Sequence, residues 1–107
     1  MSSKKAAVDK RALPPRTSDC SKAFFKDWER LTHSGRYDMK RLKSAMLLLI
    51  GREAALGAEW LDHALKGEWA DHRECHIGGD FLLIYQLAAN GERIVFVRAG
   101  SHAELFE

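Results

Sequence analysis

The sequence predicts an α+β domain in which a two-helix hairpin packs on one face of a curled, mostly antiparallel β-sheet. Apolar residues recur at helical spacing in the first half of the chain, between residues 18 and 50. Two nearly continuous apolar runs follow at residues 81–87 and 93–98, and the Asn90-Gly91 pair between them is typical of a hairpin turn. Helices followed by strands, rather than alternating with them, indicate this fold class.

Size and composition are those of one globular domain. At 107 residues, the chain can form a hydrophobic core without disulfide or metal support. Cys20 and Cys75 lack metal or redox spacing, so we expect two reduced thiols and a cytoplasmic protein, with a single bridge as the alternative. The longest apolar run, residues 45–50, is too short to cross a membrane. We expect residues 1–10 to be a disordered tail and residues 11–107 to be a single domain.

Capping residues mark both predicted helices. Ser18 or Asp19 is expected to cap a first helix that runs to about Leu31, and Gly35 can supply the left-handed residue that ends it. Asp38 is expected to cap a second helix, and the loop between the two is short enough for an antiparallel hairpin. The second helix has one apolar stripe, formed by Met39, Leu42, Met46, Leu49 and Ile50.

Local signals also place the flanking segments. The prolines within residues 11–17 favour an edge strand or an extended arm, because proline cannot donate a backbone hydrogen bond. Residues 69–77 are a candidate strand, and together with the two apolar runs they give three antiparallel strands. Ser101 and Glu104 form a capping box, which predicts one helical turn over residues 101–106.

The net charge of +2 conceals a split between the two halves of the chain. Residues 1–52 contain 13 Lys and Arg against 5 Asp and Glu, whereas residues 53–107 contain 4 against 10. A basic half can attract a polyanion such as nucleic acid. The alternative is an ordinary solvated helix surface with a basic tail. We expect Lys40, Arg41 and Lys43 on the outward face of the second helix.

Three histidines and an aspartate form the candidate catalytic set. His63, His76 and His102 each lie at an expected element boundary beside glycine or polar residues, where a site can open to solvent. Asp80 follows the Gly-Gly turn after His76. Imidazole exchanges protons near neutral pH, so this set suits acid–base chemistry. We interpret His33 and His72 as ordinary surface or core residues.

A metal site is the alternative for the histidine-rich segment. His63, His72, Cys75 and His76 are close in sequence, but they match no structural zinc spacing. On a strand, Cys75 and His76 point to opposite faces, which separates the set. We therefore expect no metal and no cofactor.

Four motifs in this region resemble the YafQ branch of the RelE superfamily of bacterial toxins. The resemblance covers residues 17–106, and several motifs in the right order are more specific than any one of them. The motifs are His63-x-Leu65-x-Gly67-x-Trp69, Arg73-Glu74-x-His76, Asp80-Phe81-Leu82-Leu83-Ile84-Tyr85 and Gly100-Ser101-His102-x-Glu104-Leu105-Phe106.

The resemblance implies a RelE-like fold and the toxin of a type II toxin–antitoxin system. Such a toxin is a ribosome-dependent endoribonuclease that cleaves translated mRNA on the 70S ribosome. The resemblance also implies a DinJ-like antitoxin that neutralises the toxin, and contact with operator DNA only through that antitoxin. The position after Asp80 is usually Trp in this branch and is Phe81 here, which keeps a stacking face but loses an indole N–H.

The family reaction can proceed by attack of the RNA 2′-OH on the adjacent phosphate, which requires a base, an acid and a group that holds the phosphate. We expect His76, held by Asp80, to be the base and His102 to be the acid, although these two roles can be exchanged. We expect His63 or Arg73 to hold the phosphate.

The remaining roles concern binding. Phe81 and Phe106 are expected to stack on splayed bases, and Lys40, Arg41 and Lys43 are expected to contact ribosomal RNA. One alternative is a non-catalytic RelE-fold partner that acts as a co-repressor with its antitoxin. Another is an RNA-binding module that does not cleave.

Overall fold

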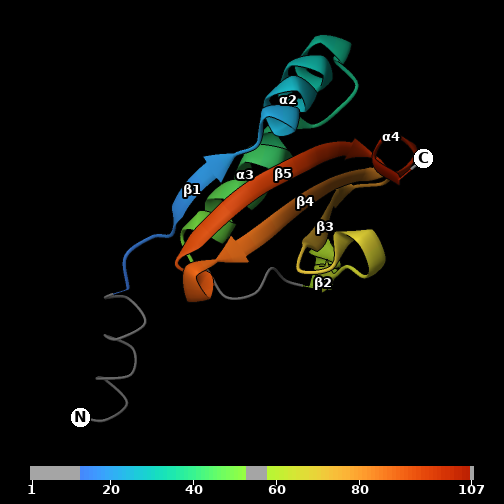
Figure 1. The fold of residues 1–107 in the computed structure, drawn as a ribbon. Coiled ribbons are helices and arrows are strands. Elements are labelled where there is room, and N and C mark those ends of the chain that lie inside the picture. The colour runs from blue at the N-terminus through green and yellow to red at the C-terminus, as the bar shows by residue number, and fades with distance from the viewer. Residues whose placement is uncertain (1–12, 53–57, 107) are drawn as a thin grey trace.

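The protein forms an open, five-stranded mixed sheet with strand order β1-β5-β4-β3-β2, as a computed structural model shows for residues 13–52 and 58–106 (Figure 1). The expected tail, residues 1–10, lies outside the described residues. The strands are β1 Thr17–Cys20, β2 His63–Ala64, β3 Arg73–Gly78, β4 Phe81–Ala88 and β5 Arg93–Ser101. The helices are α2 Lys22–Ser34, α3 Met39–Ile50 and α4 His102–Phe106, with 3₁₀ turns η1 Ala58–Trp60, η2 Gly67–Trp69 and η3 Ala89–Gly91.

This architecture confirms the predicted fold class. Helices α2 and α3 are joined by a short turn, at which the chain reverses direction (Figure 1), and α4 is a single short helix at the end of β5. Three of the four strand pairings are antiparallel, whereas β1 and β5 are parallel. In the part of the chain that the structure describes, no helix is long and apolar enough to span a bilayer.

The two helices begin and end through local capping contacts, one of which differs from the prediction. The Oγ of Ser21 accepts the Phe24 N–H at 2.9 Å, so α2 starts after Ser21 and not after Ser18 or Asp19, which lie in β1. Gly35 adopts the left-handed conformation with φ of 69°, as expected. Asp38 caps α3 by accepting the Arg41 N–H, which is also as expected.

Of the two edge strands, β2 was not predicted, and β1 forms later than residues 11–17, for which an edge strand was one alternative. Strand β1 begins where the expected arm ends, and its polar residues pair with the first half of β5. An ion pair between Asp19 and Arg93 supports this pairing, with Oδ2 and Nη2 2.6 Å apart. Strand β2 has only two residues and pairs with β3 at the other edge. The candidate strand at residues 69–77 was placed too early, because η2 occupies its start.

Strand β4 is the centre of the core, as its apolar sequence predicts. Phe81, Leu83 and Tyr85 belong to the main hydrophobic cluster, which also contains residues of α2 and α3. Leu82 and Ile84 point to the opposite face and form a second cluster with Leu105 of α4. The hairpin between β4 and β5 turns at the predicted residues, although the connection is the three-residue η3 with Asn90 at φ 57°.

Candidate active site

The face of the sheet opposite α2 and α3 brings two of the candidate histidines together around one carboxylate. His63 in β2 pairs with Glu74 in β3, and His76 lies two residues further along β3 on the same face. The Oε2 atom of Glu74 is 3.3 Å from the Nε2 atom of His63 and 3.4 Å from that of His76. Glu74 is only 5% exposed, so its carboxylate contacts these two imidazoles and meets little solvent.

The ring of His63 is held from both sides. Its Nδ1 atom lies 2.7 Å from the carbonyl oxygen of Leu61, which can only accept a hydrogen bond, so Nδ1 carries a proton. The Nε2 atom then faces Glu74. Leu61 has a positive φ of 49°, which is uncommon for a residue with a branched side chain and turns its carbonyl toward the ring. The backbone thus fixes the orientation of His63.

Asp80 does not hold His76, contrary to the prediction. Its Oδ1 atom instead accepts the backbone N–H of His102 at 3.1 Å, across the gap between the β3–β4 turn and the start of α4. Glu74 takes the place beside His76 that the sequence interpretation gave to Asp80. Residues two apart on a strand share a face, so the spacing of Glu74 and His76 was a signal that could have identified this carboxylate.

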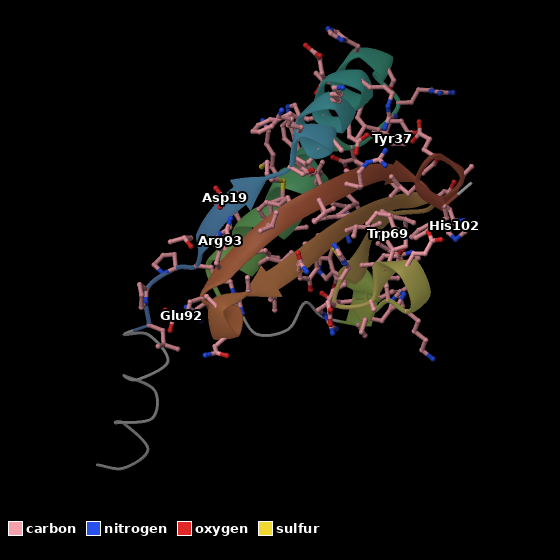
Figure 2. All side chains as sticks on the ribbon, viewed as in Figure 1. Asp19, Tyr37, Trp69, Glu92, Arg93 and His102 are labelled. Atoms are coloured by element: carbon pink, nitrogen blue, oxygen red, sulfur yellow. The ribbon has the colours of Figure 1, made fainter. Side chains whose placement is uncertain are left out.

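His102 lies at the start of α4, at the end of β5 (Figure 2). The capping box forms as predicted: Glu104 N–H donates to Ser101 Oγ at 3.2 Å, and Ser101 N–H donates to Glu104 Oε1 at 2.7 Å. Arg30 of α2 reaches the same carboxylate, with Nη1 and Oε2 2.6 Å apart. Burial alone would raise the pKa of Glu104, but the Ser101 and Arg30 contacts outweigh it and lower the pKa.

Gly100 provides the space for these contacts. A Cβ atom at this position would lie 2.7 Å from Glu104 Oε1 and 3.3 Å from Arg30 Nη2. Because the Glu104 and Arg30 side chains are already fixed by their ion pair, a larger residue here would displace one of them. The glycine that precedes the capping box is therefore needed for the turn that carries His102.

Arg73 is not positioned to hold a phosphate between the histidines. It alternates with Glu74 along β3 and pairs with Tyr85 on the other face of the sheet. Its Nε and Nη2 atoms lie 2.8 and 2.7 Å from Asp62, which also accepts the Tyr85 hydroxyl. Burial lowers the pKa of Arg73, but the hydrogen bonds and the Asp62 charge outweigh it and raise the pKa. This guanidinium is part of a structural ion pair.

The two expected stacking residues occupy different environments. Phe81 is 5% exposed and packs against Tyr37 in the main core, with the ring centroids 4.8 Å apart, so the expectation that it stacks on a base is not supported. Phe106 is only partly buried, and its ring lies 4.9 Å from that of His102 and 5.9 Å from that of Trp69. Trp69, to which the sequence interpretation gave no role, contacts Phe106 at the same end of the sheet as His102 (Figure 2).

The three residues that are expected to bind the ribosome also occupy different environments. Lys40 and Lys43 are exposed on α3. Arg41 is instead held against the fold: its Nε donates to the Ile77 carbonyl, and its guanidinium lies 4.0 Å from the centre of the Trp60 ring. The contact with Trp60 secures the segment that leads into β2 and His63. Arg41 thus has a structural role, and its expected contact with ribosomal RNA stays a prediction.

One group of the described residues has metal-ligand geometry. Ligand atoms of His63, Glu74 and His76 all lie within 4.8 Å of one another. Cys75 points into the core, where burial raises the pKa of its thiol to about 12, so the set considered from the sequence is separated as expected. In the observed group, the third possible ligand is the Glu74 carboxylate and not the Cys75 thiol. Two imidazoles and a carboxylate suit Zn²⁺ or Cu²⁺, and the same groups suit proton transfer.

The chain resembles known proteins along most of its length. It is 39% identical over 77 residues to the mRNA interferase toxin YafQ of Escherichia coli strain K12, covering 72% of this chain and 82% of that protein. The crystal structure of the E. coli DinJ–YafQ complex matches with a TM-score of 0.76 and 37% identity, over 86% of this chain and 99% of that chain. A metal-bound toxin from Helicobacter pylori matches with a TM-score of 0.75 and 41% identity, over 85% and 99%.

A family model described as the bacterial toxin of type II toxin–antitoxin systems, YafQ, matches residues 16–107. The match includes β2, β3 and α4, which carry the histidines. The resemblance inferred from the four sequence motifs is thereby confirmed: this chain belongs to the YafQ family of bacterial type II toxins.

Proposed function

We propose that this toxin is an mRNA interferase, an endoribonuclease that cleaves translated mRNA on the ribosome. Its E. coli relative is named an mRNA interferase toxin. The observation that best supports the proposal is the placement of imidazoles at two ends of one surface. His76 lies opposite Leu82 on β4, and His102 contacts Phe106 beside the same apolar cluster. The end of β5 that leads into His102 pairs with the other side of Leu82, so the two histidines come from the strands on either side of β4.

The reaction follows from these two positions. His76, oriented by Glu74, removes the proton from the 2′-OH, and the 2′ oxygen attacks the adjacent phosphorus. The bond between phosphorus and the 5′ oxygen breaks, and His102 protonates the leaving 5′ oxygen. The products are a 2′,3′-cyclic phosphate and a 5′-OH end. The RNA supplies its own nucleophile, so this chemistry requires no metal or cofactor.

We assign to His63 an electrostatic role toward the phosphate, because both of its ring nitrogens already face partners in Leu61 and Glu74. Its Nδ1 is bonded to Leu61, and its ring centroid lies 6.1 Å from that of His76, so it borders the space in which the phosphorane would form. A protonated imidazole there would stabilise the added negative charge. Asp80 acts indirectly, by holding the backbone at His102.

The binding partners follow from the family and the charge distribution. The E. coli relative forms a complex with DinJ, and we propose that a DinJ-like antitoxin neutralises this toxin and links it to operator DNA. Lys40 and Lys43 on the exposed side of α3 are suited to ribosomal RNA phosphates. A cytoplasmic location follows from action on ribosomes. A purely co-repressing partner is the second candidate, since it requires only the antitoxin contact.

Cleavage by variants on programmed ribosomes tests the proposal. His76→Ala and His102→Ala should each lower the single-turnover rate by about 10²–10⁴-fold, the usual range for loss of a general base or acid. His33→Ala is the matched control, because His33 is exposed on α2 and outside the set. A wild-type protein that represses its operon with the antitoxin but cleaves no mRNA would instead establish the co-repressor role.

A further inference from the structure

An open groove lies between η2 and α4, beside His102. It has a volume of about 570 Å³ and is lined by Glu68, Trp69, His72, Leu105 and Phe106. Figure 2 shows Trp69 and His102 toward the same end of the molecule. The two sides of the groove come from segments more than thirty residues apart, so the fold, and not local sequence, creates it.

Aromatic rings line the groove in a fixed arrangement. Trp69 meets His72 edge to face, with centroids 5.3 Å apart and planes at 89°, and it meets Phe106 at 5.9 Å and 75°. Trp69 and Phe106 also pack on the buried cluster of Leu82, Ile84 and Leu105. Partly exposed rings that are held in this way can stack on a nucleobase without first losing much conformational freedom.

The polar groups of the groove are hydrogen-bond acceptors. Glu68 supplies a carboxylate, which accepts hydrogen bonds and repels phosphate. The Nδ1 atom of His72 lies 3.1 Å from the Ala70 carbonyl oxygen and must donate to it, so Nε2 of the neutral ring is left as an acceptor. A groove with aromatic walls and two acceptors suits a base that carries an exocyclic amino group. In uracil, the only ring N–H lies between two carbonyl oxygens, which a carboxylate repels.

We infer that this groove binds the base of the nucleotide on the 3′ side of the cleaved bond, and that it favours adenine, guanine or cytosine over uracil. The inference rests on the proposed function, because the assignment to the 3′ side of the cleaved bond depends on the role proposed for His102. His102 protonates the 5′ oxygen of the leaving nucleotide, and its ring is 4.9 Å from that of Phe106 at the edge of the groove. The leaving nucleotide is therefore the one whose base can enter.

The test uses the full-length protein and ribosomes programmed with four mRNAs. The wild-type cut is mapped first, and the mRNAs then differ only in the nucleotide that follows it. The wild-type protein should cleave the messages with adenine, guanine or cytosine faster than the message with uracil. Glu68→Gln should bring these rates closer together, because an amide donates as well as accepts. Asp71→Asn is the control, since Asp71 is an exposed neighbour that does not line the groove.

The stacking contribution is tested with Trp69. Trp69→Ala should lower the rate at subsaturating protein for all four messages by about 5- to 150-fold, the range expected for one base stack. Trp69→Phe should retain most of the rate, and it supports the inference even if the alanine variant folds poorly. The inference is overturned if the wild-type protein cleaves all four messages equally well, if Glu68→Gln leaves the base preference unchanged, or if a folded Trp69→Ala variant cleaves like the wild type. If the wild-type protein cleaves none of the four messages, the proposed function itself fails.

Discussion

Glu74 is the residue whose role differs most from what its sequence position suggests. A glutamate in a strand is usually an exposed side chain, yet this one is buried to 5% exposure between two imidazoles. A carboxylate that accepts from one imidazole nitrogen orients the ring and stabilises its protonated form. Glu74 therefore links His63 and His76 through contacts of one carboxylate oxygen with both rings.

Glu74→Gln tests that coupling. The amide keeps the shape of the side chain, but its NH₂ group donates where the carboxylate only accepts, so His76 should be oriented less firmly. We expect the single-turnover rate of mRNA cleavage to fall by about 10²-fold, the lower end of the range for acid–base catalysis. Glu92→Gln, which changes an exposed glutamate in the η3 turn region, is the control. A rate for Glu74→Gln within threefold of the wild type would remove Glu74 from the mechanism.

The same three residues predict a response to added metal. Zn²⁺ or Cu²⁺ bound by His63, Glu74 and His76 would compete with the contact between Glu74 and His76 that orients the proposed base. We expect either ion to raise the melting temperature of the isolated toxin, because ligands that bind only the folded state stabilise it. The shift should disappear in His63→Ala and persist in His33→Ala. An equal shift in both variants would show that the ion binds elsewhere.

At the scale of elements, the site depends on how α4 is attached. Glu104 receives Ser101 N–H with one oxygen and Arg30 with the other, so the turn that carries His102 is fixed both locally and to α2. Glutamine can replace glutamate in a capping box, but alanine cannot. A comparison of Glu104→Gln with Glu104→Ala therefore tests whether the site needs the capping hydrogen bond.

We expect Glu104→Ala to lower the cleavage rate by up to about 10²-fold, which is the effect of a displacement of about 1 Å at a reacting group. Glu104→Gln should cleave at a rate closer to that of the wild type, because its carbonyl can still accept from Ser101. Single-turnover rates on programmed ribosomes would measure both. If alanine and glutamine both leave the rate unchanged, the turn does not need this cap.

Elements with local signals were predictable, and those without were not. Asp38 and Gly35 mark the helix ends because caps depend on nearby residues. Ser18, Asp19 and Ser21 are all good caps, and only the pairing of β1 with β5 decides that Ser21 is used. Strand pairing joins residues that are far apart in sequence, and the polar β1 and the two-residue β2 have no alternation to reveal them.

The candidate site residues were likewise predictable where a local motif marks them and not where the strand register decides. His63, His76 and His102 could be located from the motifs, and Phe106 does lie beside His102. Which face each side chain occupies was harder, because it depends on the register. Arg73 and Glu74 are adjacent in sequence but lie on opposite faces of β3, so the expected phosphate ligand is structural and the overlooked neighbour is in the site.

At the scale of the whole molecule, a buried carboxylate connects the helical layer to the sheet. Asp27 of α2 is 4% exposed, and it accepts from Arg98 Nε at 2.7 Å, the Ala99 N–H at 3.0 Å and Arg30 Nη2 at 3.0 Å. Burial alone would raise the pKa of Asp27, but these hydrogen bonds outweigh it and lower the pKa below its ordinary 3.8. Because Arg30 also binds Glu104, this network extends to the turn that carries His102.

The lowered pKa of Asp27 predicts acid sensitivity. A carboxyl whose folded-state pKa is depressed contributes stability that is fully present above about pH 4 and is lost as the pH falls through the folded-state value. The free energy of unfolding in urea should therefore fall more steeply below pH 4 for the wild type than for Asp27→Asn. The asparagine variant should already be less stable at pH 7, by less than the ~3–5 kcal/mol of a fully buried pair, because Arg98 and Arg30 are partly exposed.

Asp19→Asn is the control for that comparison, because it alters an exposed ion pair of the same sheet. Such surface pairs contribute about 0–1 kcal/mol, so its curve should follow that of the wild type. Parallel acid dependence of the wild type and Asp27→Asn would show that other carboxylates control stability at low pH.

In the proposed mechanism, the RNA supplies the nucleophile while His76 and His102 transfer the protons. The chemistry of the product ends tests this most directly. Ribosomes programmed with an mRNA labelled at each end would be incubated with the toxin, and the termini of the fragments would be identified by mass. We predict a 2′,3′-cyclic phosphate or its 3′-phosphate hydrolysis product on the upstream fragment, and a 5′-OH on the downstream fragment. A 3′-OH with a 5′-phosphate would contradict the mechanism, because it requires water to attack in place of the 2′ oxygen.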